Sequence, residues 1–127
     1  MKKIILPIFL LISIIGYSQF ITIDESLTVQ QLVEDILIDS PCAQTSNYGS
    51  RTGVDYGEGN GIAAFNGNNS NFPYKTGIIL SSGFVSNAPG PNQQDNSNGG
   101  NNWLGDDDLE IYTSTNNSNN ASFIQFD

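Results

Sequence analysis

From Asn47 onward, short apolar runs alternate with segments that are rich in asparagine and glycine. Disordered chains lack such runs, because they cannot bury enough apolar surface to offset the entropy lost on ordering. Turn-forming residues between short apolar runs indicate strands that are joined by loops. The candidate strands are GIAAF (61–65), TGIILSS (76–82), LEIYT (109–113) and ASFIQFD (121–127), and residues 21–23 add a further one.

One amphipathic helix is predicted within LTVQQLVEDILID. Thr28 and Gln31 have the T-x-x-Q spacing of a capping box, and Leu27 and Leu32 are spaced as a hydrophobic staple. Pro41 disfavours helical geometry in the residue before it, so the helix should end there. Its apolar face consists of Val29, Leu32, Val33, Ile36 and Leu37. The sequence therefore predicts a mainly β fold, a β-sandwich or jelly roll, with one N-terminal amphipathic α-helix.

The first residues have the layout of a secretory signal peptide over residues 1–18. A basic start is followed by an apolar run at 4–15 and by small residues, the last of which is Ser18. The run is well short of the roughly 20 residues that cross a bilayer. We therefore expect cleavage between Ser18 and Gln19, no membrane insertion afterwards, and a secreted or cell-surface product with one domain over 19–127.

The charge of the chain limits the partners that it can bind, and its cysteine content limits the disulfides that it can form. Without Lys2 and Lys3, two cations, Arg51 and Lys75, remain against all thirteen acidic residues. Such a surface repels nucleic acid and anionic lipid, so neither is an expected partner. Cys42 is the only cysteine, so no disulfide can form within the chain. Its thiol is either buried or paired with a cysteine outside this sequence.

Most catalytic motifs are missing. The chain has no histidine, which removes Ser-His-Asp and Cys-His catalysis and the commonest zinc ligand. The stretch LSSG has Ile79 where a nucleophile elbow needs its first glycine. The glycine-rich GEGNG (57–61) lacks the G-K-[ST] and the following helix of a phosphate loop. We therefore predict that the protein is not an enzyme.

One acidic stretch, GDDDLEIY, contains carboxylates that could bind a metal ion or a substrate. Asp106, Asp107 and Asp108 repel one another unless a cation, backbone N–H groups or water offsets the repulsion. One hypothesis is that these carboxylates bind calcium, a cation that takes oxygen ligands. A solvated turn with a structural Asp cap is the second interpretation. A third is a carbohydrate-binding or glycan-hydrolysing site, in which Trp103 stacks on a sugar.

The order of these segments resembles the opening part of the choice-of-anchor L domain, which is found on exported and surface-attached bacterial proteins. The resemblance covers nearly all of the chain after the signal peptide, and G-I-I-L-S-S-G with D-D-D-L downstream is its most specific part. The residues that carry it are Gly61 and Ile62 with Phe65, then 76–83, 90–92, 105–109 and 121–127.

The resemblance implies an extracellular, β-rich module without a known catalytic role. In that family a separate C-terminal segment attaches the protein or directs its secretion, and in flavobacteria-like hosts it is usually a type IX secretion sorting domain. The strand that resembles ASFIQFD runs on into further strands, so the resemblance implies an incomplete domain at Asp127 and a missing anchor or sorting segment. The expected function is that of an exported, non-catalytic cell-surface or adhesion-type module. Its expected ligand is a surface glycan or protein, and calcium is its candidate cofactor. A purely structural spacer is an alternative.

Overall fold

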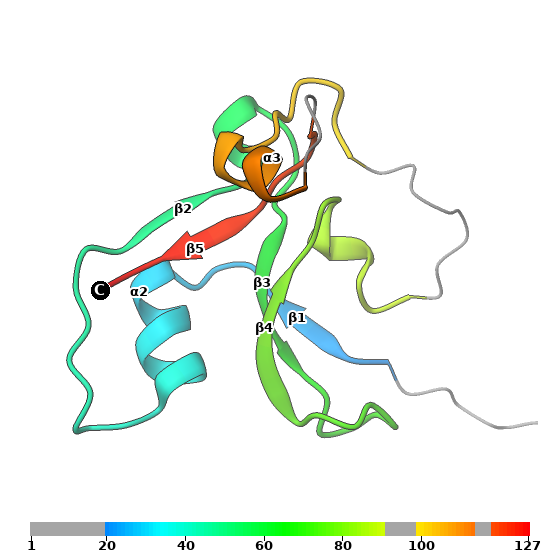
Figure 1. The fold of residues 1–127 in the computed structure, drawn as a ribbon. Coiled ribbons are helices and arrows are strands. Elements are labelled where there is room, and N and C mark those ends of the chain that lie inside the picture. The colour runs from blue at the N-terminus through cyan, green and yellow to red at the C-terminus, as the bar shows by residue number, and fades with distance from the viewer. Residues whose placement is uncertain (1–19, 91–98, 114–117) are drawn as a thin grey trace, which may run out of the picture.

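The computed structural model describes residues 20–90, 99–113 and 118–127, and its strands form two antiparallel sheets (Figure 1). The larger sheet has the order β1-β3-β4, and the smaller one pairs β2 with β5. The strands are β1 (Thr22–Asp24), β2 (Gly49–Arg51), β3 (Ile62–Asn66), β4 (Thr76–Leu80) and β5 (Phe123–Gln125). The predicted mainly β class is confirmed. The predicted signal peptide lies outside the described residues.

The helix begins where its capping box predicts. Thr28 Oγ1 accepts the backbone N–H of Gln31 at 3.2 Å, and Gln31 Oε1 accepts the backbone N–H of Thr28 at 2.9 Å. These reciprocal bonds satisfy two donors that the first turn would otherwise leave free. The α-helical part, α2, is short (Val29–Gln31). The T-x-x-Q prediction is confirmed.

After this first turn the helix continues as a π-helix over Leu32–Ile38, with hydrogen bonds that span five residues. The last of these joins the N–H of Asp39 to the carbonyl of Glu34 at 3.0 Å. Asp39 has a φ of 42°, the left-handed geometry with which many helices end. The helix therefore stops just before Pro41, as predicted.

The core lies between this helix and the sheets. Leu32, Ile62 and Ala64 are buried and form its centre. Leu27, which lies just before the helix, packs against this centre, as the predicted staple requires. The other partly buried side chains against it are Ile36, Ile78 and Ile124. The predicted apolar face of the helix does not extend to Leu37, which is 57% exposed.

Strands β3 and β4 form a hairpin in which Ile62 pairs with Leu80 and Asn66 with Thr76. Because side chains alternate along a strand, residues 62 and 64 share the face that packs on the helix. Phe65 faces the other way and pairs with Ile23 of β1 on one side and with Gly77 of β4 on the other.

One predicted strand is wrong, because LEIYT (109–113) is part of a helix, α3 (Asp107–Thr113). The alternation in LEIYT covers only five residues, too few to outweigh the aspartates before it. Asp106 accepts the N–H of Asp108 through Oδ1 at 3.1 Å, as an N-cap residue does. Acidic side chains in the first turn also interact favourably with the helix dipole.

Two short 3₁₀-helices complete the described elements, at Gly53–Tyr56 and Val85–Asn87. The second lies in the segment after β4. Strand β2 was not predicted, because its sequence, GSR, contains no apolar residue. None of the helices in the described ranges has the length and hydropathy to cross a membrane.

Candidate functional site

The acidic stretch lies at the start of α3, and the fold uses much of its bonding capacity. Asp106 donates its N–H to Ser118 Oγ at 3.1 Å, and its carbonyl accepts the N–H of Glu110 at 3.1 Å. Its Oδ1 caps Asp108, as described above. Glu110 in turn accepts the N–H of Ser118 at 2.7 Å and its hydroxyl at 3.0 Å. These bonds hold the start of the helix against the segment before β5.

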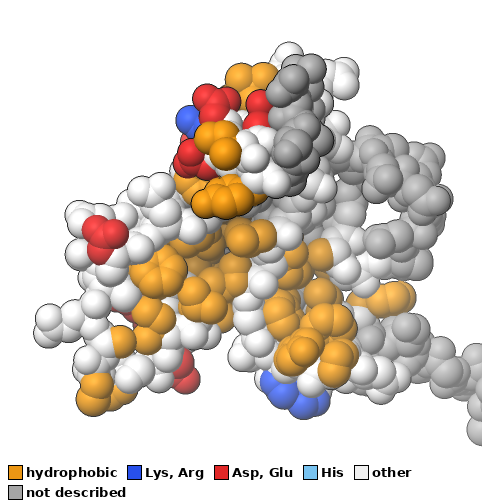
Figure 2. Space-filling model, in the orientation of Figure 1, with side chains coloured by type: hydrophobic (Ala, Val, Ile, Leu, Met, Phe, Trp, Pro, Cys, Tyr) orange, Lys and Arg blue, Asp and Glu red, His pale blue; other side chains and the backbone are white. Residues whose placement is uncertain are grey.

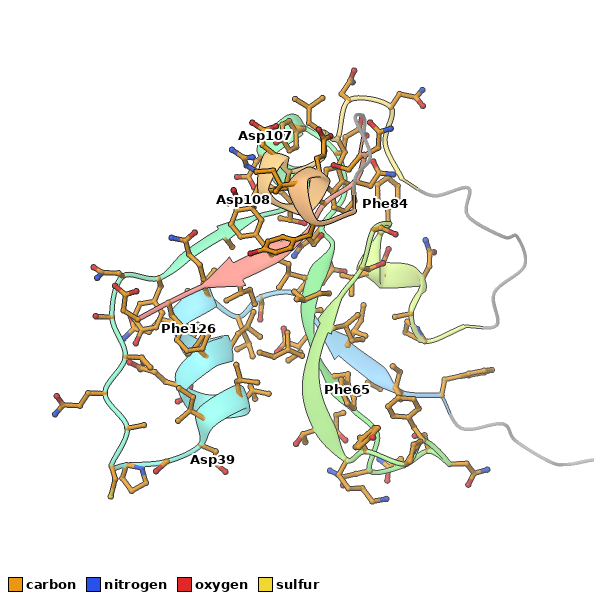
Figure 3. The ribbon with its side chains drawn as sticks, viewed as in Figure 1. Asp39, Phe65, Phe84, Asp107, Asp108 and Phe126 are labelled. Atoms are coloured by element: carbon orange, nitrogen blue, oxygen red, sulfur yellow. The ribbon has the colours of Figure 1, made fainter. Side chains whose placement is uncertain are left out.

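A cation of the chain itself lies beside this stretch. Arg51 Nη1 is 3.7 Å from Asp106 Oδ2, and the Asp106 side chain is 16% exposed. The guanidinium also lies 5.9 Å from the ring centroid of Phe123, within reach of a cation–π interaction. Asp107 and Asp108 are exposed on α3 (Figure 3). Arg51 therefore offsets part of the negative charge that the sequence concentrates here.

Calcium binding by Asp106, Asp107 and Asp108 stays a prediction. Across residues 20–90, 99–113 and 118–127, no three His, Cys, Asp or Glu side chains form a group that could hold a metal ion. The second interpretation of the stretch, a structural Asp cap, has the hydrogen-bond geometry described above for Asp106.

Trp103, the proposed sugar-stacking residue, is buried. Its side chain is 1% exposed, and its Nε1–H donates to the carbonyl of Ala121 at 2.8 Å. The ring lies against the backbone at Gly61, where an added Cβ would be 2.6 Å from a ring carbon. A side chain larger than glycine therefore does not fit at this position. Neither face of the indole is free to stack on a ligand.

The glycine-rich segment after the first 3₁₀-helix is a packed turn. Thr52 Oγ1 accepts the N–H of Gly61 at 2.6 Å, and the carbonyl of Gly53 accepts the N–H of Glu58 at 2.9 Å. A phosphate loop would need such N–H groups for its ligand. The Glu58 carboxylate also accepts the backbone N–H of Asn102 at 3.3 Å. The segment thus joins two distant parts of the chain. Its N–H groups at Gly61 and Glu58 are already bonded, which agrees with the sequence argument against a phosphate loop.

A hollow of about 520 Å³ lies at the end of the helix. Its lining residues are Glu34, Asp35, Ile38, Asp39, Ser40, Pro41, Ala43 and Thr45. Tyr48 closes the loop beyond it, because its hydroxyl donates to Glu34 and lies 2.9 Å from the carbonyl oxygen of Thr45. Burial, and then the hydrogen bond to Glu34, raise the pKa of Tyr48. Cys42, in the same loop, is exposed, so the buried-thiol interpretation is wrong.

An exposed group of aromatic side chains was not predicted as a site. Phe65, Phe72 and Tyr74 lie at the turn end of the β3–β4 hairpin and form what we call the hairpin aromatic cluster. Phe72 is 43% exposed and Tyr74 is 67% exposed. The sequence carried a signal for it, the apolar triplet FPY inside an asparagine-rich connection. Such triplets are unexpected in a loop that serves only as a turn.

Comparison with family models gives a match to the choice-of-anchor L domain over residues 21–127. The chain belongs to this family. The match begins just before β1 and includes every described strand, so the two sheets and the helix of this choice-of-anchor L domain lie within it. Comparison with the curated proteins and with the solved structures gives no match. Membership makes the protein a surface-associated bacterial module.

Proposed function

We propose that this choice-of-anchor L domain is an exported, non-catalytic module that acts at the bacterial surface in binding or adhesion. The family membership supports the surface role. The N-terminal sequence supports export by a cleaved signal peptide. The complete lack of histidine supports a role that needs no histidine-based proton transfer.

The observation that supports a non-catalytic role is that Asp106 and Trp103, the side chains with catalytic or binding chemistry, are bonded within the fold. Asp106 caps α3 and lies beside Arg51, and the indole N–H of Trp103 bonds to a backbone carbonyl in the interior. Groups bound in this way hold segments together and have little capacity left for a substrate. Their contacts support a structural role.

The alternative, a glycan hydrolase, has less support. Such enzymes place two carboxyl groups roughly 5–10 Å apart on either side of the scissile bond. Asp106, Asp107 and Asp108 follow one another in the sequence at the start of one short helix, with Asp106 as its N-cap. A sugar held by Trp103 would require the indole to leave its buried site, in which it is 1% exposed.

Export and surface display can be tested with the full chain, carrying a C-terminal epitope tag, in a bacterial host. We expect the tag in the exported fraction, loss of the tag when whole cells are treated with protease, and an N-terminus at Gln19. A matched variant in which Leu10 and Leu11 are replaced by Asp should stay in the cytosol, because a charged h-region is no longer apolar. A wild-type product that stays in the cytosol would overturn the proposal.

The non-catalytic part needs a second measurement on the same purified product. We expect it to bind wells coated with mucin, collagen or cellulose, and to release no reducing ends from cellulose or from mucin glycans. Asp106→Asn is the control variant. Release of reducing ends by the wild type that disappears in Asp106→Asn would overturn the non-catalytic assignment and favour the hydrolase.

A further inference from the structure

The hairpin aromatic cluster is built by the sheet beneath it. Phe65 of β3 is opposite Gly77 of β4, and its ring lies across the backbone there. An added Cβ at Gly77 would be 2.6 Å from a carbon of the Phe65 ring, so the glycine is needed for the ring to lie flat over the strand. Cross-strand pairs of this kind fix the position of an aromatic side chain. Figure 3 shows Phe65 on the hairpin.

The two other rings extend from Phe65 toward solvent. Phe72 meets Phe65 edge to face, with ring centroids 5.5 Å apart and planes at 90°. Tyr74 lies 5.9 Å from Phe72 with planes at 62°. Exposure increases along this row, from half-buried Phe65 to Phe72 at 43% and Tyr74 at 67%. Edge-to-face pairs are favourable, so each ring holds the next in place.

The connection that carries Phe72 and Tyr74 is itself fixed by hydrogen bonds. The N–H of Gly67 donates to the carbonyl of Lys75 at 2.8 Å, which closes the loop at its base. The hydroxyl of Ser70 donates to the Gly67 carbonyl at 2.9 Å and accepts the N–H of Phe72 at 3.1 Å. The aromatic side chains are therefore presented by an ordered loop, which reduces the entropy lost when a ligand binds.

The charge around the cluster differs from that of the rest of the chain. The sequence has no acidic residue between Glu58 and Asp95, although its net charge is −9. Lys75 adds a cation directly after Tyr74. In Figure 2, hydrophobic side chains gather over the turn end of the hairpin beside a basic one, and the acidic side chains of this face lie away from it. The exposed amides of the connection are those of Asn66, Asn68, Asn69 and Asn71.

We propose that the hairpin aromatic cluster is a binding surface for neutral glycans, an inference that rests on the proposed surface function and names the residues that contact the ligand. The C–H groups on one face of a sugar ring are apolar and slightly positive, and they complement the negative face of an aromatic ring. Sugar hydroxyls can both donate to and accept from the neighbouring asparagine amides. An anionic lipid surface fits less well, because the protein as a whole is strongly acidic.

Affinity electrophoresis of the exported product tests this directly. The protein has a pI near 4.1, so it migrates toward the anode in a native gel at pH 8. The gels contain hydroxyethylcellulose, galactomannan or laminarin, which are neutral polysaccharides. We expect at least one of them to retard the wild type. Tyr74→Ala should weaken that binding about tenfold, as the loss of a central aromatic contact does, and Tyr74→Phe should retain it.

Tyr112→Ala is the matched control, because Tyr112 is 88% exposed on α3, outside the cluster. The proposal is supported if a polysaccharide retards the wild type and Tyr112→Ala but no longer retards Tyr74→Ala. Equal retardation of all variants would overturn the assignment of the site, and no retardation by any of the three polysaccharides would overturn the ligand class. Flotation with vesicles of phosphatidylcholine and phosphatidylglycerol, lost in Tyr74→Ala without any retardation, would replace the glycan by a membrane surface. None of these failures affects the surface-display experiment, which tests the proposed function separately.

Discussion

Replacing Trp103 with phenylalanine should lower the free energy of unfolding by about 2–4 kcal/mol. The indole is 1% exposed, and its N–H donates to the Ala121 carbonyl at 2.8 Å. Phenylalanine has no such donor, so the carbonyl stays buried without its partner, at a cost of about 1–3 kcal/mol. The smaller ring also buries roughly 40 Å² less surface, which corresponds to about 1 kcal/mol.

Urea denaturation followed by far-ultraviolet circular dichroism measures this loss without needing the tryptophan. With a slope of about 1.5 kcal/mol/M, the midpoint should fall by about 1.3–2.7 M while the slope itself stays the same. Tyr112→Phe is the matched control, because it also removes a polar group from an aromatic side chain, but one that is 88% exposed. Its free energy of unfolding should stay within about 0.5 kcal/mol of the wild type.

Fluorescence of the wild type gives an independent reading, because Trp103 is the only tryptophan in the chain. We expect blue-shifted emission from the native state that moves to longer wavelength on unfolding. If the native emission already matched that of the urea-unfolded chain, or if Trp103→Phe were as stable as Tyr112→Phe, Trp103 would not be a core residue. The argument against its stacking on a sugar would then fail.

Three further predictions concern the helix, its loop and the acidic stretch. Leu32→Ala should lower the free energy of unfolding by about 2–5 kcal/mol, because this side chain is 2% exposed in the core; a loss below about 1 kcal/mol in urea would contradict the packing described. The raised pKa of Tyr48 means that the folded state holds this proton more tightly than the unfolded state. Its contribution is therefore complete below the unfolded pKa of about 10 and is lost as the pH rises through the folded pKa. Tyr48→Phe should flatten that alkaline decrease in urea denaturation between pH 8 and 11, and parallel curves for the two proteins would argue against it. If residues 106–108 bind calcium, calcium at ten times its Kd adds about 1.4 kcal/mol and raises Tm by about 6–11 °C, whereas identical melting in calcium and in chelator would remove the hypothesis.

The elements that could be predicted have their signals close together in the sequence. The capping box at Thr28 and Gln31, the staple and the stop before Pro41 are all local, and the helix follows them. The runs that form β3 and β4 are bounded by turn formers, and the hairpin between them needs no distant partner. Patterns of this kind are physical causes of structure, so they transfer directly to the fold.

The missed strand β2 depends on residues far away in the chain, whereas α3 was missed although its signal is local. Strand β2 has no apolar residue and exists because Arg51 and its neighbours pair with β5. The helix α3 was predicted as a strand because the alternation in LEIYT was given more weight than the aspartates before it. The tertiary structure also decides that the Asp106 side chain lies beside Arg51 and not in open solvent. No local sequence pattern contains that information.

The site was only partly predictable for the same reason. The sequence shows that Asp106, Asp107 and Asp108 are concentrated charge, but not that Ser118 and Glu110 hold the start of their helix. It shows that Trp103 is aromatic, but not that the carbonyl of a residue 18 positions further along accepts its N–H. Burial decides between a binding and a structural role here, and burial is a property of the assembled fold.

The pairing of β2 with β5 has a consequence for the time at which the chain can fold. Gly49 is opposite Gln125, so the smaller sheet cannot form until the chain is available through residue 125. Closing so long a loop costs entropy before the pairing stabilises it, and pairing between distant residues slows folding. A polypeptide that is exported before it folds, as we propose for this one, gains from such a delay in pairing.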